Sequence, residues 1–154
     1  MDVPAAIGAG LLAGAVMAAL LYMGIAMMPR QMRMNLFFLL GSMVFRQGAM
    51  VYIAGAMMHG VMSIVFGLIH VGLYQAFGLE ASLAAWGLLF GFGHYLIVGM
   101  AFGMMPIMHP RIRAGDLQAP GFYALGYPKA TAAGFFMLHL VYGLLVGSLY
   151  AAFV

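Results

Sequence analysis

The 154-residue sequence contains no cysteine and few charged residues. Only 6% of its residues are Asp, Glu, Lys or Arg, comprising six basic and three acidic side chains. The absence of cysteine excludes a disulfide-stapled secreted domain, and three surplus positive charges are too few for a nucleic-acid-binding surface. A soluble globular domain carries about 25% charged residues, so this chain has too little charge to cover a surface in water.

Hydrophobic residues make up 66% of the chain, and the mean hydropathy is +1.09. A membrane-spanning helix needs about 20 mostly apolar residues, and four stretches meet that length: 5–28, 49–78, 81–105 and 130–153. Backbone groups in lipid must be hydrogen-bonded within their own segment, so each stretch is expected to be a helix. The sequence therefore predicts an all-α polytopic membrane protein, with four transmembrane helices in a single domain over residues 1–154.

Lys and Arg are confined to two of the segments that connect these spans. The first and third connecting segments carry three each, namely Arg30, Arg33 and Arg46, and Arg111, Arg113 and Lys129. Positively charged loops tend to stay on the cytoplasmic side of a membrane. We therefore expect a multi-pass protein of the bacterial inner (cytoplasmic) membrane with both termini on the periplasmic, extracytoplasmic side.

Prolines and one short apolar stretch give further local detail. Pro29 and Pro106 are expected to end the first and third spans, and Pro128 to begin the fourth, because proline is disfavoured inside a helix and tolerated in its first turn. Residues 34–45 are apolar but too few to cross a bilayer. This stretch is therefore predicted to be an interfacial or re-entrant segment.

The two halves of the chain resemble each other. Residues 10–29, shifted by 77 positions, give eight identities in twenty positions, and a shift of 80 aligns His59 with His139 and Gly67 with Gly147. Because each half holds two spans, this repeat predicts two helical hairpins related by an axis along the membrane normal. Small residues spaced four apart on every span favour close helix contacts in one compact bundle. The pairs are Gly10/Gly14, Gly87/Gly91, Gly99/Gly103 and Gly143/Gly147, with a longer stripe of Gly55, His59, Ser63 and Gly67.

Histidines are the main polar residues within the predicted spans. Counted from the cytoplasmic edge, His59, His94 and His139 lie nine to eleven residues in, a depth of about 15 Å at the helical rise. The repeat aligns Met17 with His94. We therefore predict that Met17, His59, His94 and His139 form a ring across the bundle, one residue from each helix. Polar groups at this depth are costly, which makes them candidate functional residues.

Two cofactors suit such a ring. Imidazole and thioether groups bind copper, and two facing imidazoles in a four-helix bundle suit haem b. The predicted cofactor-binding residues are His59, His94 and His139, with Met17 as a further metal ligand. Many of the 17 methionines lie in the cytoplasmic half, where they fit either copper handling or flexible packing. The alternative for the histidines is that they only form hydrogen bonds between helices.

Three segments of the second half carry a family resemblance. They read GMAFGMMPIMHPRI (residues 99–112), PGFYALGY (120–127) and FFMLHLVYGLLVGSLY (135–150). With these segments the sequence resembles small bacterial four-helix membrane proteins that are grouped as a domain of unknown function, and the likeness covers nearly the whole chain. The resemblance implies a four-span fold and no particular activity.

Three functions remain open from the sequence. The leading hypothesis is a small subunit of a membrane redox or metalloenzyme complex that holds haem b or copper. The first alternative is a cofactor-free structural or assembly subunit, and the second is a small-solute channel or transporter. No acidic residue lies inside a span and no set of nucleophile and base is present, so we do not expect an enzyme by itself. The expected partners are membrane lipid and other membrane-protein subunits or further copies of this chain, not nucleic acid.

Overall fold

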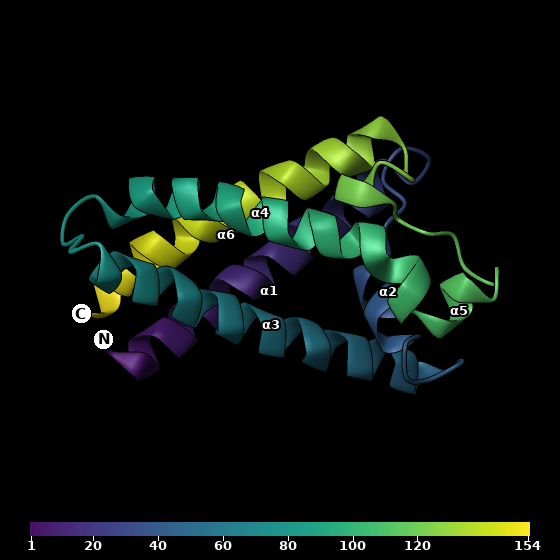
Figure 1. The fold of residues 1–154 in the computed structure, drawn as a ribbon, viewed down its shortest axis with the longest axis horizontal. Coiled ribbons are helices and arrows are strands. Elements are labelled where there is room, and N and C mark those ends of the chain that lie inside the picture. The colour runs from purple at the N-terminus through teal and green to yellow at the C-terminus, as the bar shows by residue number, and fades with distance from the viewer.

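A computed structural model describes residues 1–154 and consists of helices joined by short connections (Figure 1). Four helices are long, namely α1 (Val3–Met27), α3 (Ala49–Ala76), α4 (Leu83–Met108) and α6 (Lys129–Phe153). Each of them is long and apolar enough to cross a membrane. The predicted all-α, four-span fold is confirmed, and we describe the chain as a multi-pass membrane protein.

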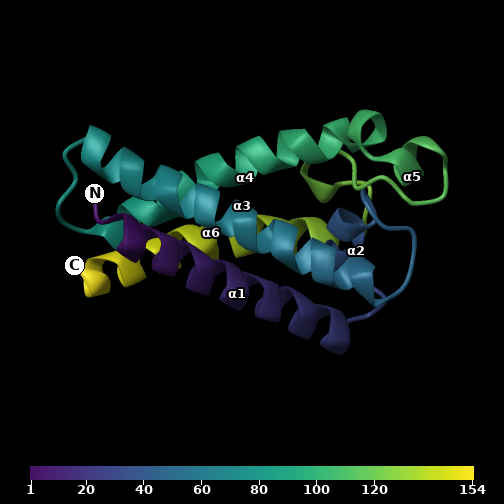
Figure 2. The same cartoon turned by 90° about the horizontal axis from the view of Figure 1, so that it is seen from below.

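The four long helices run up and down the bundle. Both termini lie at one end, beside the connection between α3 and α4 (Figures 1 and 2). The opposite end holds three short elements, α2 (Leu36–Gly41), α5 (Pro110–Arg113) and the 3-10 turn η1 (Phe122–Ala124). All six Lys and Arg residues fall in the connections at this opposite end or on the first residue of α6. We call it the basic end, and the other the terminal end.

Proline marks two of the three helix boundaries predicted from it. Pro29 follows the end of α1, and Pro128 directly precedes α6, as expected. Pro106 does not end α4, which continues to Met108. Pro106 has no N–H to donate to the Phe102 carbonyl and its ring crowds that carbonyl, but only two residues of α4 follow it.

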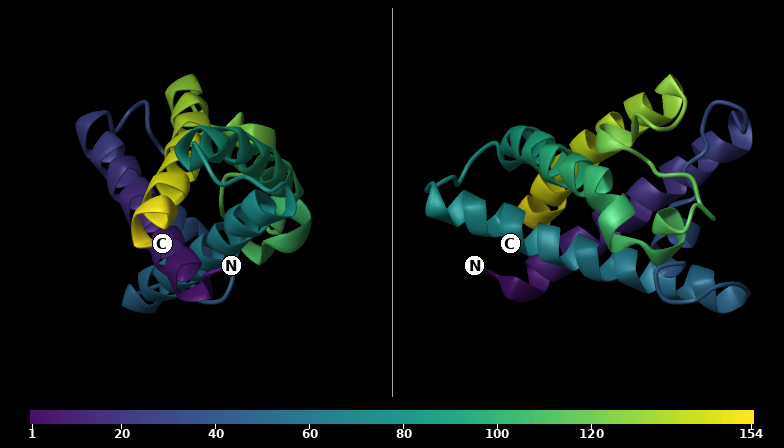
Figure 3. Two further views of the ribbon diagram at one scale, coloured as in Figure 1. Left: turned by 90° about the vertical axis from the view of Figure 1, so that its left-hand side faces the viewer. Right: turned by 45° about the vertical axis from the view of Figure 1, so that its right-hand side comes forward.

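The long helices pack as two hairpins, and the two contacts between the hairpins differ in extent. Helix α1 packs along α3, and α4 packs along α6, in agreement with the predicted repeat. The hairpins join mainly between α1 and α6, whose terminal ends lie together in Figure 3, whereas α3 and α4 touch at few positions. If the two hairpins were related by symmetry, the α1–α6 contact and the α3–α4 contact would be equally extensive. Instead, α3 and α4 diverge toward the basic end (Figure 2).

Glycines set the close contacts within each hairpin. In the first hairpin, Gly10 of α1 lies against Gly67 of α3, and a Cβ on either glycine would meet the backbone of the other. Gly87 of α4 and Gly143 of α6 have the same relation in the second hairpin. Small residues at these positions let the helix backbones approach closely, as the spacing predicts.

The Gly99/Gly103 pair of α4 has a different use from the one predicted. The nearest atoms to the two glycines belong to the rings of Tyr123 and Phe122 in η1, which cover them. Tyr123 reaches this position with a positive φ of 55°, a backbone conformation that is uncommon for residues with a side chain. The glycines therefore fix the α4–α6 connection on α4.

The apolar segment predicted over residues 34–45 forms α2, which packs on the first part of α3. Gly41 lies on the backbone of Val51, and Gly55 lies on the backbone of Phe37. The Asn35 side chain caps α2 by accepting a hydrogen bond from the backbone N–H of Phe38 at 3.1 Å. This short helix fills part of the space between the diverging ends of α3 and α4.

The outer surface of the long helices is apolar. Large hydrophobic side chains on all four are exposed, including Leu12, Ile53, Leu89 and Met137. A contiguous apolar exterior of this extent is unstable in water and requires contact with lipid or with another membrane protein.

Candidate ligand-binding cavity

A cavity of about 340 Å³ lies between α3 and α4, beneath α2. Its wall contains all four residues of the predicted ring, Met17, His59, His94 and His139, one from each long helix. Of its 22 lining residues, 18 are hydrophobic. The structure therefore brings the predicted residues together, and it places them around an apolar space.

The cavity opens sideways. Met62 on α3 and Ile97 and Met108 on α4 line it and are 46%, 59% and 58% exposed. These residues border the gap where α3 and α4 diverge, on a face of the bundle that is otherwise apolar. The cavity therefore opens to the outer surface of the bundle between α3 and α4.

His94 lies at the deep side of the cavity among aromatic rings. Its imidazole stacks on the ring of Phe66, with ring centroids 3.5 Å apart and planes 17° apart. The His139 ring meets it edge to face at 4.7 Å, and the Tyr142 ring does so at 5.1 Å. Glycine at position 91, one turn before His94, lies on the backbone of His139 and lets α4 and α6 approach. His94 is thus held by packing on three sides.

Backbone carbonyls fix the tautomers of His59 and His139. Nε2 of His59 lies 3.0 Å from the carbonyl oxygen of Gly14 on α1, and Nδ1 of His139 lies 2.7 Å from that of Phe135 on its own helix. A carbonyl only accepts, so these nitrogens carry the hydrogen and donate it. The other nitrogen of each ring, Nδ1 of His59 and Nε2 of His139, keeps a free lone pair. The hydrogen bonds expected for histidines without a ligand therefore exist, and they leave ligand atoms available.

The two nitrogens of His94 face different surroundings. Nδ1 is buried and has no hydrogen-bond partner. Nε2 of His94 also has no hydrogen-bond partner, but it is not fully buried, and His94 lines the cavity. Nε2 of His139 likewise has no partner, is not fully buried and belongs to a cavity-lining residue. The apolar cavity therefore has a small polar end, formed by unpartnered imidazole nitrogens on neighbouring helices.

Seven of the 17 methionines line the cavity, namely Met17, Met34, Met43, Met58, Met62, Met105 and Met108. Three others that the sequence offered for copper handling, Met23, Met27 and Met57, are 53% to 73% exposed on the outer surface. The methionines thus include a cavity set and an exposed set, with Met32 buried outside the cavity, and only the cavity set can contact a bound ligand.

The geometry can be compared with what each predicted cofactor requires. Two axial imidazoles of one haem iron lie on opposite faces of a porphyrin, with ring centres about 6 Å apart for metal–nitrogen bonds near 2 Å. The rings of His94 and His139 are closer than this and perpendicular, and the glycine contacts between α4 and α6 leave no space for a porphyrin between them. No three His, Cys, Asp or Glu side chains form a metal-binding group, so copper would need thioether ligands as well.

A hydrogen bond links α6 to α3 at the cavity. The hydroxyl of Tyr142 on α6 donates a hydrogen bond to the backbone oxygen of Ser63 on α3, and both residues line the cavity. The Ser63 hydroxyl donates to the His59 carbonyl on its own helix. The sequence analysis did not select Tyr142 or Phe66. Helical spacing was the available signal, because Phe66 lies seven residues after His59 on α3 and Tyr142 lies three residues after His139 on α6.

His109, outside the predicted ring, has a structural role at the basic end. Its Nδ1 accepts hydrogen bonds from the backbone N–H groups of Arg111 and Ile112, which caps α5. Its Nε2 must then carry the hydrogen, and it lies 3.0 Å from the carbonyl oxygen of Leu39 and 3.2 Å from the hydroxyl of Ser42. The buried ring therefore joins α2 to the end of α4.

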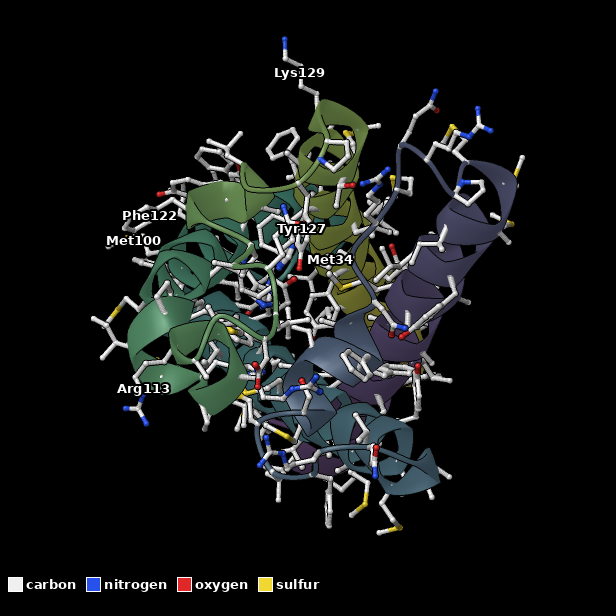
Figure 4. The ribbon with its side chains drawn as sticks, turned by 90° about the vertical axis from the view of Figure 1, so that its right-hand side faces the viewer. Met34, Met100, Arg113, Phe122, Tyr127 and Lys129 are labelled. Atoms are coloured by element: carbon white, nitrogen blue, oxygen red, sulfur yellow. The ribbon has the colours of Figure 1, made fainter.

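Figure 4 views the molecule from the basic end. Arg113 and Lys129 extend outward, whereas Met34 and Tyr127 lie nearer the middle of this end. Met34 is 3% exposed and belongs to the cavity wall. Tyr127 is part of a smaller pocket near α2, and burial raises the pKa of its phenol. The basic end is thus charged at its rim and apolar beneath.

The chain was compared with family models, with curated proteins and with solved structures, and none of these comparisons gives a match.

Proposed function

We propose that this protein binds one lipophilic small molecule within the membrane, in the cavity between α3 and α4. The observation that carries the proposal is the composition of that cavity: an apolar wall, a sideways opening and unpartnered imidazole nitrogens at the deep end. Ligand sites typically have volumes of about 300–1,000 Å³ and combine apolar walls with a few polar groups that orient the ligand. The cavity has this size and character.

The proposed ligand has an apolar body and one hydrogen-bonding group. The apolar part would lie against the side chains from α2, α4 and the methionines, and the polar group would meet His94 and His139. Nε2 of His139 is a hydrogen-bond acceptor because Nδ1 donates to Phe135. A ligand group that donates a hydrogen bond, such as a hydroxyl, would therefore satisfy a nitrogen that otherwise has no partner.

The redox-subunit hypothesis takes a specific form under this proposal. A lipophilic carrier that exchanges hydroxyl and carbonyl forms would fit both the apolar wall and the imidazole end. The apolar wall gives less support to a channel for small polar solutes, since such a path needs polar groups along its length. Docking on a larger membrane protein remains compatible, because the exposed apolar faces of the long helices lie outside the cavity.

Copper is a second candidate ligand, and one observation favours it. His59 and His139 each donate one ring N–H to a backbone carbonyl, which is the usual arrangement for a histidine that binds metal through its other nitrogen. Thioethers of the cavity methionines would supply the soft ligands that Cu(I) prefers. Cu(I) titration against a chelator would separate the candidates: replacing His139 by Phe should abolish metal binding, whereas replacing the exposed Met137 by Leu should not.

Membrane placement is part of the proposal. With all basic side chains at one end, the positive-inside rule puts the basic end in the cytoplasm and both termini on the extracytoplasmic side of a bacterial inner membrane. The cavity opening would then lie in the cytoplasmic half of the bilayer.

Native mass spectrometry tests ligand binding directly. Protein extracted gently from its own membrane should carry a discrete non-covalent adduct, which solvent extraction then identifies. Ala101 lines the cavity and Ala56 lies on the outer surface of α3, so Ala101→Trp should remove the adduct and Ala56→Trp should retain it. A wild-type protein without an adduct, or equal adducts in both variants, would contradict the proposal.

A further inference from the structure

A second, smaller pocket of about 150 Å³ lies at the basic end, where two connections of the chain meet. Its wall is built from α2 with the residues just before it and from the segment between α5 and α6. The first segment contributes Arg33, Asn35 and Phe38, and the second contributes Leu117, Gln118 and Tyr127. No residue of this wall lines the cavity between α3 and α4, so the two sites are separate.

Side-chain donors without a partner gather in this wall. Oδ1 of Asn35 accepts hydrogen bonds from the Tyr22 hydroxyl and from the backbone N–H of Phe38. The amide nitrogen Nδ2 of Asn35 therefore keeps two hydrogens to donate. The Arg33 guanidinium and the Tyr127 hydroxyl form no hydrogen bond within the chain either. Burial raises the pKa of Tyr127, which keeps its phenol protonated as a donor.

The pocket has no negative charge of its own. Asp116 is the only acidic residue at the basic end, and it is exposed and outside the pocket wall. Gln118 donates one N–H to the carbonyl oxygen of Gly126 at 2.6 Å and keeps a second N–H on the same nitrogen. The wall thus combines one full positive charge with several N–H and O–H donors. This combination suits an oxyanion, because hydrogen bonds to a charged acceptor are roughly twice as strong as neutral ones.

Both sides of the pocket are held in place by the chain itself. The backbone N–H of Arg33 donates to the hydroxyl of Thr131, which is 1% exposed and in turn donates to the carbonyl oxygen of Gln31. On the other side, the N–H of Gly126 donates to the carbonyl oxygen of Pro120 at 2.7 Å. A ligand therefore has to order side chains only, which lowers the entropic cost of binding.

We propose that this pocket binds a phosphate group, with Arg33 providing the charge and Asn35 and Tyr127 donating hydrogen bonds to its oxygens. The volume suits one such group and is below the roughly 300–1,000 Å³ of sites for drug-sized ligands. The phosphate can come from the headgroup of an anionic phospholipid or from free inorganic phosphate. Binding of either would join the α1–α2 connection to the α5–α6 segment, and it requires no ligand in the larger cavity.

The position of the pocket fits the lipid source. Arg33 follows the end of α1 and Tyr127 precedes the start of α6, which is the level of the headgroups in a bilayer that these helices span. Figure 4 shows Tyr127 near the middle of this end, whereas Arg113 points outward. Basic pockets of membrane proteins bind anionic headgroups in this way.

Native mass spectrometry tests the lipid source. Delipidated protein in detergent, given equal amounts of phosphatidylglycerol and phosphatidylcholine, should retain one phosphatidylglycerol per chain. Arg33→Gln should weaken this binding about tenfold or more, and Tyr127→Phe, which removes no charge, about fivefold. Arg113→Gln is the matched control, because it removes the same charge from an exposed residue outside the pocket, and it should bind as the wild type does.

Thermal unfolding tests the free ion. Sodium phosphate should raise the unfolding temperature of the delipidated protein above that in sodium chloride of equal ionic strength, and Arg33→Gln alone of the two arginine variants should lose this rise. A rise with phosphate and no preference for phosphatidylglycerol would assign the pocket to the free ion, and the reverse would assign it to the lipid. A wild type that responds to neither probe, or Arg33→Gln and Arg113→Gln variants that behave alike, would overturn the proposal.

Discussion

Gly87 on α4 and Gly143 on α6 face each other so closely that a Cβ on either would collide with the backbone carbonyl oxygen of the other. The relation is reciprocal, and it lies within the most extensive helix contact in the protein. Neither backbone can move away without separating the second hairpin.

Replacing Gly143 by Ala should therefore lower the free energy of unfolding by about 1–3 kcal/mol, because overpacking a tight contact forces backbone shifts. The measurement is unfolding in detergent followed by circular dichroism. Gly93 is a matched control on α4, since no atom lies within 4 Å of its position for a Cβ. Gly93→Ala should leave stability unchanged or slightly raise it, and equal losses in both variants would contradict this account of the α4–α6 contact.

The Tyr142 hydroxyl gives a second prediction. Its hydrogen bond to the Ser63 carbonyl joins α6 to α3 across the cavity. Interhelical hydrogen bonds in membrane proteins contribute about 0.6 kcal/mol on average and up to about 1.7. Tyr142→Phe should lower stability by an amount in this range, whereas Tyr52→Phe, at an exposed position without a side-chain hydrogen bond, should have no effect.

The depth of the histidines could be predicted from the sequence because a straight helix converts residue number into distance. Counting inward from the charged loops was enough to bring His59, His94 and His139 to one level, and all three line the same cavity. The direction in which each imidazole ring points could be seen only in the structure. His139 bonds to its own helix and His59 to α1, and no spacing rule distinguishes these two outcomes.

The cavity itself could not be predicted, because it results from a departure from the repeat. The sequence predicts two similar hairpins, and similar hairpins would close both junctions between them. In the first half, α2 packs on α3 through Gly41 and Gly55. The second half has no equivalent contact, because η1 packs on Gly99 and Gly103 of α4. The space between α3 and α4 depends on such long-range packing.

The sequence also contained a signal for His70 that the predicted ring did not use. His70 lies eleven residues after His59, which is three helical turns and therefore the same face of α3. Its different depth excluded it from the predicted ring. Only the packing of Tyr142 and Phe90 around it shows that its Nε2 is enclosed without a partner.

His109 gives a third prediction, on the attachment of α2. His109→Ala removes the cap of α5 and the bond to Leu39 together, and it should lower stability by about 2–3 kcal/mol at roughly 1 kcal/mol for each lost bond. Asn at this position can still cap α5 but is too short to reach α2. His109→Asn should therefore lose only part of that stability while hydrogen exchange in α2 becomes faster, and the exposed Arg113→Ala should change neither. Unchanged exchange in α2 for His109→Ala would contradict the link.

Orientation gives the fourth prediction, and the absence of cysteine makes it direct to test. Ala114 at the basic end and Glu80 between α3 and α4 are both exposed, and neither substitution removes a Lys or Arg. In whole cells, a membrane-impermeant thiol reagent should label Glu80→Cys and leave Ala114→Cys unlabelled until the membrane is opened, because basic loops stay in the cytoplasm. The unsubstituted protein is the control, since it has no thiol to react. Labelling of Ala114→Cys alone in intact cells would place the basic end outside, and the cavity opening would then lie in the outer half of the bilayer.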